Sequence, residues 1–213
     1  MAERVSAIVL AGGKSSRMGQ DKVWMMLDGQ PLIERVVRRL LPLVSEVLVS
    51  AGDPAPYHAL LRSLPVPGRV VGDAYPGYGP LAGMQAGLSA ASNDLALVVA
   101  ADMPFLNIAL IQHMIELAGG YDGVVPHIYD ARKRIGAPEP LHALYRRTCL
   151  PAIERHLAAA DRQVLCFFDE VRIRAVAPEE IRTLDPDLLS FFNVNTPADW
   201  QEARRLAAKA LQK

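Results

Sequence analysis

A glycine-rich, basic segment follows the first apolar run of the chain and has the composition of a phosphate-binding loop. It runs from Leu10 to Lys22 and contains the adjacent glycines Gly12 and Gly13. Because glycine lacks a Cβ, such a pair lets backbone N–H groups approach phosphate oxygens closely. The cationic residues of the segment are Lys14, Arg17 and Lys22. The segment therefore predicts binding of a compact anion that carries several charges.

Two familiar phosphate loops do not fit this segment. The Walker pattern requires a glycine five positions before Gly13, where the chain has Ile8. The dinucleotide fingerprint requires a glycine two positions after Gly12, where the chain has Lys14. A third type of phosphate loop remains, and its alternative is a glycine-rich strand exit with surface cations.

Two acidic residues stand where apolar runs end. Asp102 follows the run 97–101, and a carboxylate there can hold Mg²⁺ together with substrate phosphates. The alternative, a cap for the helix expected near Asn107, requires too long a reach. Asp73 follows Val70 and Val71. Its carboxylate can accept two N–H bonds from a ligand; a turn residue is the alternative interpretation.

The segment from Leu10 to Lys22 resembles the signature of the nucleotidyltransferases, which join a nucleoside triphosphate to a phosphorylated acceptor and release pyrophosphate. Three further strings are similar to one family among these enzymes, the molybdenum cofactor guanylyltransferases. They are Gly79–Gly83, Asp102–Phe105 and Phe192–Pro197. Together the four strings lie in the family's order over nearly the whole chain.

The resemblance implies that the protein is an enzyme. It implies transfer of GMP from Mg·GTP to the phosphate of molybdopterin or molybdenum cofactor, with Mg²⁺ as cofactor and pyrophosphate as the second product. Transient contact with molybdoenzymes or their chaperones would follow. The alternatives are a cytidylyltransferase or sugar-phosphate nucleotidyltransferase of the same fold, and a non-catalytic nucleotide-binding partner in molybdoenzyme maturation. The last is disfavoured because Arg17, Lys22 and Asp102 are all present.

The resemblance also implies roles for single residues. Gly12 and Gly13 would present N–H groups to the nucleotide phosphates. Arg17 would hold the β and γ phosphates, Lys22 would neutralise charge around the α-phosphate, and Asp102 would carry the metal. The full set expected to contact nucleotide, metal or acceptor is Leu10, Ala11, Gly12, Gly13, Lys22, Ser50, Asp73, Pro80, Leu81, Asp102, Asn193 and Asn195.

Several of these positions leave alternatives open. The guanylyltransferases commonly carry Asn where this chain has Ser50, and a hydroxyl cannot replace a donor and acceptor pair, so the base preference stays open. Asn193 and Asn195 alternate along an expected strand and would share one face, where they could ligate Mg²⁺ or hold the acceptor; turn-closing side chains are the alternative. His142 is interpreted as a core or cleft histidine, because a phosphate nucleophile needs no general base.

The elements that must position these residues alternate between strands and helices. Apolar runs without polar alternation predict strands buried on both faces at 7–10, 47–49, 70–71, 95–100, 124–125 and 191–194. Helical periodicity predicts helices at 31–41, 81–91, 108–117, 150–159 and 197–211, the last started by Thr196 with Asp199 three residues on. This pattern predicts a three-layer, Rossmann-like α/β fold with a mostly parallel sheet, in one domain over 1–213. Residues 129–139, with Arg132, Lys133 and Arg134, are expected to form a loop or hairpin.

Composition excludes several broad classes of protein. The formal net charge is +0, so general binding of nucleic acid or of an anionic membrane is not expected. Hydrophobic residues make up 51% and charged residues 22%, a balance typical of a folded protein. Cys149 and Cys166 lack the spacing of a disulfide framework or zinc site, which predicts reduced thiols and a cytoplasmic location.

Overall fold

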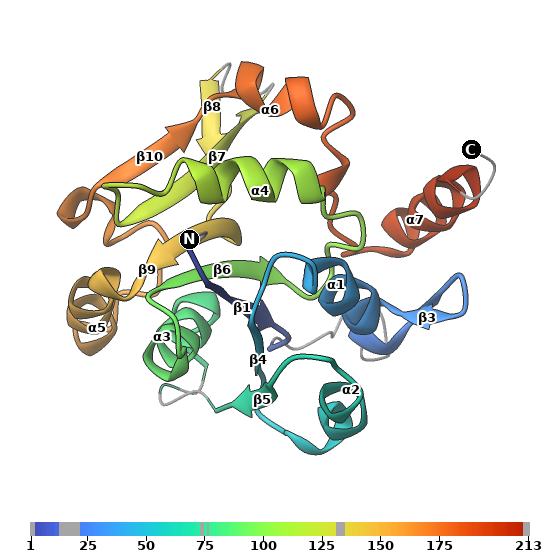
Figure 1. The fold of residues 1–213 in the computed structure, drawn as a ribbon, viewed down its shortest axis with the longest axis horizontal. Helices are drawn as coiled ribbons and strands as arrows, with labels where there is room; N and C mark the ends of the chain where they lie inside the picture. Colours follow the sequence, from blue (N-terminus) through green and yellow to red (C-terminus); the bar gives the residue numbers. More distant parts are fainter. Residues whose placement is uncertain (1–2, 13–21, 73–74, 76, 131–134, 211–213) are drawn as a thin grey trace.

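The strand that leads to the glycine-rich segment is buried on both of its faces. Val5, Ala7 and Val9 of β1 (Val5–Leu10) pack in one apolar cluster, and Ile8 packs in another on the opposite side. Because successive side chains of a strand point to opposite faces, both faces of the sheet must be covered. The computed structural model accordingly has helices on both sides of a central sheet (Figure 1). It describes residues 3–12, 22–72, 75, 77–130 and 135–210.

In the described part of the chain the main sheet has eight strands. The other seven are β4 (Glu46–Ser50), β5 (Gly68–Val71), β6 (Leu95–Ala100), β7 (Gly123–Asp130), β8 (Ile135–Pro138), β9 (His142–Arg146) and β10 (Ile173–Val176). Their order is β10-β7-β9-β6-β1-β4-β5, with β8 paired to β7. β1 lies parallel to both β4 and β6, whereas β9 is antiparallel to both β6 and β7. The predicted Rossmann-like, mostly parallel sheet is confirmed.

Helices cover the two faces of the sheet unequally. One face carries α1 (Leu32–Leu40), α2 (His58–Arg62), α4 (Ile108–Glu116) and α6 (Pro178–Leu184). The other carries α3 (Pro80–Ala90) and α5 (Leu150–Ala158). α7 (Pro197–Ala210) packs against the small hairpin of β2 (Met26–Leu27) and β3 (Gln30–Pro31). Short 3₁₀ helices lie at Lys22–Trp24, Ala55–Tyr57, Arg147–Cys149, Phe168–Glu170 and Leu189–Phe191.

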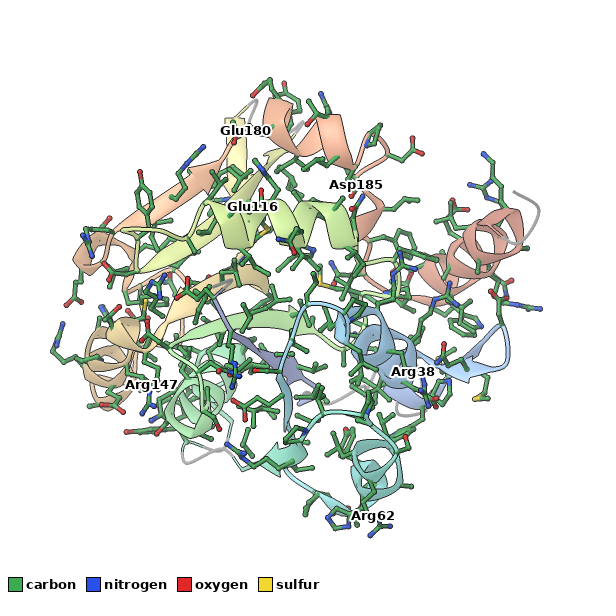
Figure 2. The ribbon with its side chains drawn as sticks, in the orientation of Figure 1. Arg38, Arg62, Glu116, Arg147, Glu180 and Asp185 are labelled. Carbon is green, nitrogen blue, oxygen red and sulfur yellow. The ribbon has the colours of Figure 1, made fainter. Side chains whose placement is uncertain are left out.

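Several helices carry charged side chains on their outer surfaces. Arg38, Arg62 and Glu116 are exposed on three different helices (Figure 2). Within the described residues, no helix combines the length and the apolar character needed to cross a membrane. The predicted hairpin within 129–139 is confirmed, because β7 and β8 pair antiparallel with Asp130 opposite Ile135.

The strand predicted at 191–194 is wrong. Leu189–Phe191 forms a 3₁₀ helix, and the chain then runs on outside the sheet. Asp185 (Figure 2), which is 5% exposed, accepts hydrogen bonds from the backbone N–H groups of Leu189 and Ser190 and so sets this turn. Phe191 and Val194 are buried by side-chain packing rather than by strand pairing. An apolar run alone does not distinguish these two kinds of burial.

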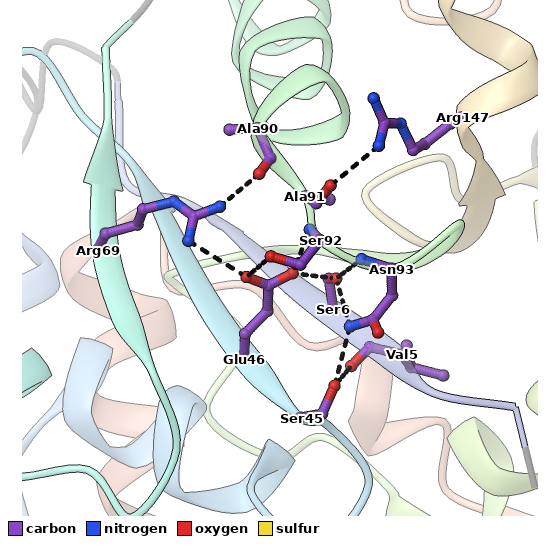
Figure 3. Close-up of polar contacts among 10 residues, drawn as sticks. All are labelled: Val5, Ser6, Ser45, Glu46, Arg69, Ala90, Ala91, Ser92, Asn93 and Arg147. Carbon is purple, nitrogen blue, oxygen red and sulfur yellow. Dashed lines mark hydrogen bonds and ion pairs between the residues drawn. The ribbon is translucent and has the colours of Figure 1, made fainter.

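A buried carboxylate holds the amino ends of β1, β4 and β5 together (Figure 3). Glu46 accepts hydrogen bonds from Ser6 Oγ at 2.6 Å and from the Ser92 backbone N–H at 2.6 Å, and it lies 3.4 Å from Arg69. Although burial raises it, the pKa of Glu46 is lowered overall, because these hydrogen bonds and the Arg69 charge favour the carboxylate. Asn93 donates from its amide to Ser6 Oγ and completes the network. The amino edge of the sheet is therefore fixed by polar contacts.

Candidate functional site

The glycine-rich segment leaves the sheet between two neighbouring strand ends. The Ala101 backbone N–H donates to Leu10 O at 3.0 Å, and the Ala11 N–H donates to Ser50 O at 3.0 Å. These bonds continue the pairing of β1 with β6 and β4 by one residue on each side. Gly12 follows directly and is exposed. The carboxyl ends of parallel strands are where open α/β sheets bind their ligands.

Three segments that are far apart in sequence meet at the ammonium group of Lys22. Lys22 Nζ lies 2.5 Å from Asp102 Oδ2 and 2.8 Å from Asn195 Oδ1. The side chains of Lys22 and Asp102 are 21% and 12% exposed, so the ion pair is only partly screened by solvent. The structure therefore brings together the cation, the carboxylate and one of the amides predicted from the sequence.

Asp102 keeps one carboxylate oxygen without a partner. Its Oδ1 atom is buried and has no hydrogen-bond partner among the described residues. The helix-cap alternative does not hold, because Asn107 itself caps α4 by accepting a hydrogen bond from the Leu110 N–H at 3.1 Å. An unpartnered buried carboxylate oxygen costs free energy unless a cation or donor reaches it. The chemistry of this oxygen fits Mg²⁺, which prefers hard oxygen ligands.

A second convergence of potential ligands does not fit Mg²⁺. Among the described residues, ligand atoms of His156, Asp161 and Cys166 lie within 4.8 Å of one another. The thiol and the imidazole are soft ligands that magnesium does not prefer. Both imidazole nitrogens already face carboxylates, Asp161 Oδ2 at 3.2 Å and Glu170 Oε1 at 2.8 Å. The imidazole is therefore already engaged by carboxylates of the chain.

Helix α1 supports the segment that follows Asp102. Arg35 Nε donates to Pro104 O at 3.2 Å, and Arg39 Nε donates to Leu106 O at 2.8 Å. The Arg35 guanidinium also lies over the Phe105 ring, 5.7 Å from its centroid. Burial and the nearby Arg35 charge lower the pKa of Arg39. Two arginines of one helix thus fix the backbone just beyond the candidate metal ligand.

The first turn of α3 packs directly on the ends of β1 and β4. Gly79 precedes it with φ +74° and ψ −155°, a conformation that is essentially restricted to glycine. A Cβ on Gly83 would lie 2.7 Å from Ser50 Oγ and 3.0 Å from Leu10 Cδ2, so only glycine allows this approach. Pro80 is exposed and Leu81 is fully buried, so Leu81 can face a ligand only through its backbone. The helix N-terminus adds a partial positive charge to this edge.

The two predicted amides have different partners. Asn195 is exposed and accepts from Lys22, whereas Asn193 donates from its side chain to Phe191 O at 3.1 Å. The expected common face belongs to a strand, and these residues form no strand in the structure. Asn193 adopts the alternative role of a turn-closing side chain. The backbone N–H of Val194 nevertheless donates to Asp102 O at 3.0 Å and keeps this segment beside the site.

Several predicted residues cannot be placed. Gly13, Arg17 and Asp73 lie outside the described residues, and so do the cations predicted near the hairpin tip. Their roles stay predictions. His142 is described and is fully buried, with Nε2 2.6 Å from Ser190 Oγ. Burial lowers the pKa of His142 to about 4, so the imidazole is neutral at pH 7.

The sequence reasoning missed a link between Asp199 and the site. The spacing of Thr196 and Asp199 indicates a helix cap, and the structure has that cap. The same Asp199 carboxylate also accepts from the Asn195 backbone N–H at 2.9 Å, next to the side chain that contacts Lys22. No signal in the spacing indicates that second contact.

Comparisons with known proteins agree with this geometry. A protein named "Probable molybdenum cofactor guanylyltransferase" from Pelotomaculum thermopropionicum is 38% identical over 205 residues, which cover 96% of this chain and 94% of that protein. The "Molybdenum cofactor guanylyltransferase" of Desulfosudis oleivorans is 33% identical and covers 94% of this chain and 95% of its own. Both matches cover at least 94% of this chain.

A solved structure shares the fold at similar coverage. The molybdopterin-guanine dinucleotide biosynthesis protein A from Archaeoglobus fulgidus superposes with a TM-score of 0.79 and 28% identity, covering 96% of this chain and 99% of that chain. Residues 7–173 match the family model described as "MobA-like NTP transferase domain". The chain therefore belongs to the MobA-like NTP transferases, a family of nucleotidyltransferases.

Proposed function

We propose that the protein transfers GMP from GTP to the terminal phosphate of molybdopterin or of its molybdenum-loaded form. The products are the guanine dinucleotide cofactor and pyrophosphate. The observation that carries the proposal is the Lys22 ammonium, bound to Asp102 and Asn195 beside the end of β1. The names of the relatives at 33% and 38% identity support both the base and the acceptor.

The reaction requires positioning and charge neutralisation rather than a covalent intermediate. An oxygen of the acceptor phosphate attacks the α-phosphorus of GTP in line, the bond to the bridging oxygen breaks, and pyrophosphate leaves with that oxygen. Because the nucleophile is already an anion, no general base is needed. In our proposal Lys22 exchanges its contact with Asp102 for an α-phosphate oxygen and stabilises the charge that develops there.

Asp102 is the residue that would hold Mg²⁺. Its Oδ1 atom is buried and has no partner in the described parts of the chain, and this supports the assignment. Bound Mg²⁺ would neutralise phosphate charge and assist departure of pyrophosphate. Gly12 and Gly13 would donate N–H groups to the phosphates, and Arg17 would hold the β and γ phosphates. The N-terminus of α3 would add its partial charge nearby.

Cytidylyl transfer to the same acceptor is the second candidate, and the observation that favours it is Ser50. Ser50 is 5% exposed, and its hydroxyl lies against Gly83. Packing under α3 therefore explains a serine at this position, and Ser50 need not contact the base. Guanine selection would then depend on Asp73 and on the segment that leads into α3. A carboxylate that accepts two N–H bonds suits guanine and not cytosine.

We also propose a cytoplasmic location with transient transfer of the product to molybdoenzymes or their chaperones. Both cysteines, Cys149 and Cys166, carry free thiols, and this supports a reducing compartment. Burial raises the pKa of Cys149 to about 12, so its thiol is unreactive at neutral pH.

The test is pyrophosphate release from GTP, CTP, ATP and UTP in the presence of Mg²⁺ and molybdopterin. We expect turnover with GTP. We expect the Asp102→Asn variant to lose about 100-fold or more in kcat, because it removes the charge of the metal ligand. Asp94→Asn is the matched control: Asp94 lies just before β6, at the opposite end of the strand that leads to Asp102, and its side chain is 57% exposed.

The outcomes separate the alternatives. Turnover with CTP alone would overturn the guanylyl assignment, and wild-type rates in Asp102→Asn would overturn the metal assignment. A folded protein that binds GTP and turns over none of the four nucleotides would be the non-catalytic partner. If Asp94→Asn also loses activity, the loss in Asp102→Asn is caused by damage to the fold and not by loss of a metal ligand.

A further inference from the structure

The side chain that holds Lys22 comes from a segment with little support of its own. Asn195 is exposed, and the residues before it lie outside any strand. The hydrogen bond from Val194 N–H to Asp102 O ties the segment to the site one residue earlier. An exposed asparagine without backbone restraint would sample several conformations and lose contact with Lys22. Its backbone must therefore be held by another group.

That group is the carboxylate of Asp199 in the first turn of α7. Asp199 Oδ2 accepts from the Asn195 N–H at 2.9 Å and from the Thr196 N–H at 2.8 Å. Thr196 Oγ1 in turn accepts from the Asp199 N–H at 3.1 Å. In an ordinary capping box the acidic side chain accepts a hydrogen bond from the N–H of the cap residue alone. Here the carboxylate also fixes the residue before the cap, which is the one that contacts Lys22.

The electrostatics point in the same direction. Partial burial acts to raise the pKa of Asp199, but the hydrogen bonds from Asn195 and Thr196 and the positive charge of Lys22 lower it overall. The Lys22 charge that pairs with Asp102 is thus one of the influences that favour the Asp199 carboxylate. When Lys22 exchanges Asp102 for a phosphate oxygen, Asn195, whose backbone Asp199 holds, remains as its partner.

We propose that Asp199 is a positioning residue for nucleotidyl transfer, acting through Asn195 on the Lys22 ammonium. The inference rests on the proposed function and extends it to a residue on the last helix. A positioning role of Asp199 can be distinguished from a role in folding, because apolar contacts hold α7 in place independently of Asp199. Ala203 and Ala207 pack with Leu27 and Leu32. Loss of the carboxylate would leave the helix docked, at a cost of about 1 kcal/mol for the missing cap.

The kinetic test compares Asp199→Ala with Asp199→Asn. We expect Asp199→Ala to lower kcat by about tenfold to a hundredfold with little change in the KM for GTP, because a displaced cation affects the transition state more than nucleotide binding. Asp199→Asn keeps an oxygen acceptor and should recover most of the rate. Glu202→Ala on the same helix is the control, since Glu202 pairs only with Arg205 among the described residues.

A second readout does not depend on turnover. Lysine-selective acylation of the substrate-free protein, quantified by mass spectrometry, reports how firmly Lys22 is held. We expect faster acylation of Lys22 in Asp199→Ala than in the wild type, Asp199→Asn or Glu202→Ala.

Unchanged kcat and unchanged Lys22 acylation in a folded Asp199→Ala protein would overturn the proposal and leave Asp199 as a cap only. If Asp199→Ala does not fold, the Asp199→Asn variant decides. A wild-type kcat and wild-type acylation of Lys22 in Asp199→Asn would support the hydrogen-bonding role, whereas a lower kcat together with faster acylation would contradict it. If the wild-type protein does not turn over GTP, the proposed function fails, while the acylation rates still decide whether Asp199 positions Lys22.

Discussion

Lys22 has two oxygen partners from the chain itself. One is the anionic Asp102 and the other is the neutral amide of Asn195. The ammonium can exchange the Asp102 carboxylate for a phosphate while it keeps the hydrogen bond to Asn195. The exchange therefore costs less free energy than complete removal of the ammonium from its partners. Such local compensation is consistent with a chain whose formal net charge is +0.

His142 is a titratable residue outside this exchange, and its burial has a consequence for stability. The imidazole is fully buried, contacts Ser190 and packs against the Phe191 ring at 4.7 Å. Its pKa falls from 6.5 to about 4 on folding. The unfolded chain therefore binds a proton at a higher pH than the folded protein, and stability is lost as pH falls from about 6.5 towards 4.

Over this pH range, protonation of His142 should lower the free energy of unfolding of the wild type by about 3 kcal/mol. We expect the His142→Gln variant to lack this decrease. Glutamine can keep a polar contact with Ser190 and does not titrate. The measurement is urea denaturation from pH 7 to pH 4 for both proteins, and the difference between them cancels the carboxylates they share. Parallel curves at all pH values would contradict the assignment.

The sequence predicts individual residues well where a strand end determines their place. Lys22 and Asp102 were both expected at the carboxyl edge, and they are in contact. Asn193 and Asn195 are predicted to lie on one strand, but they have separate partners in a segment that follows the turn set by Asp185. Hydrogen bonds between distant segments decide such positions, and spacing along the chain does not contain them.

At the scale of elements, the closest packing joins β1 to α3. A Cβ on Gly87 would lie 2.5 Å from Ile8 Cγ2 and 2.8 Å from Ile8 Cδ1. Ile8 is fully buried in the middle of the sheet and cannot move into free space. The contact brings α3 close to the strand that carries the glycine-rich segment.

We expect Gly87→Ala to destabilise the protein by about 1 to 3 kcal/mol through overpacking, although alanine is the better helix former by about 1 kcal/mol. Chemical denaturation measures the change. Ser89→Ala, at an exposed position of the same helix, is the control and should leave stability the same or slightly higher. A Gly87→Ala protein as stable as the wild type would show that α3 can move away from the sheet without cost.

Elements were predictable where an apolar pattern was long or buried on both faces. The predicted strand at 95–100 coincides with β6, and the predicted helices correspond to α1, α3, α4, α5 and α7. The short α2 and α6 and the edge strand β10 carry too few apolar residues to show a period. The strand predicted at 191–194 failed for the opposite reason, since its apolar residues are buried without pairing.

At the scale of the whole molecule, the apolar clusters are linked through shared elements. β1 contributes to the clusters on both faces of the sheet, and α1 contributes Ile33 to one of them and Leu32 to the cluster under α7. Elements that share side chains across clusters are expected to unfold together. One domain over residues 1–213 stays a prediction, and cooperative unfolding is its test.

We expect a single cooperative unfolding transition. Trp24 packs with the cluster beneath α1 and Trp200 with the cluster beneath α7, so tryptophan fluorescence samples both. Fluorescence and far-ultraviolet circular dichroism should give the same midpoint in urea. Separate midpoints for the two signals would indicate that α7 and the β2–β3 hairpin unfold independently.

The antiparallel strand β9 has a consequence for how such an enzyme can diversify. Because β9 runs against β6, with His142 opposite Val99, its first residues and the β7–β8 hairpin emerge at the same edge as Asp102. The glycine-rich segment and Asp102 come from the first half of the chain and this hairpin from the second. An exchange of the hairpin between relatives would alter one part of this edge and leave the glycine-rich segment and Asp102 intact, so the two parts can evolve as separate modules.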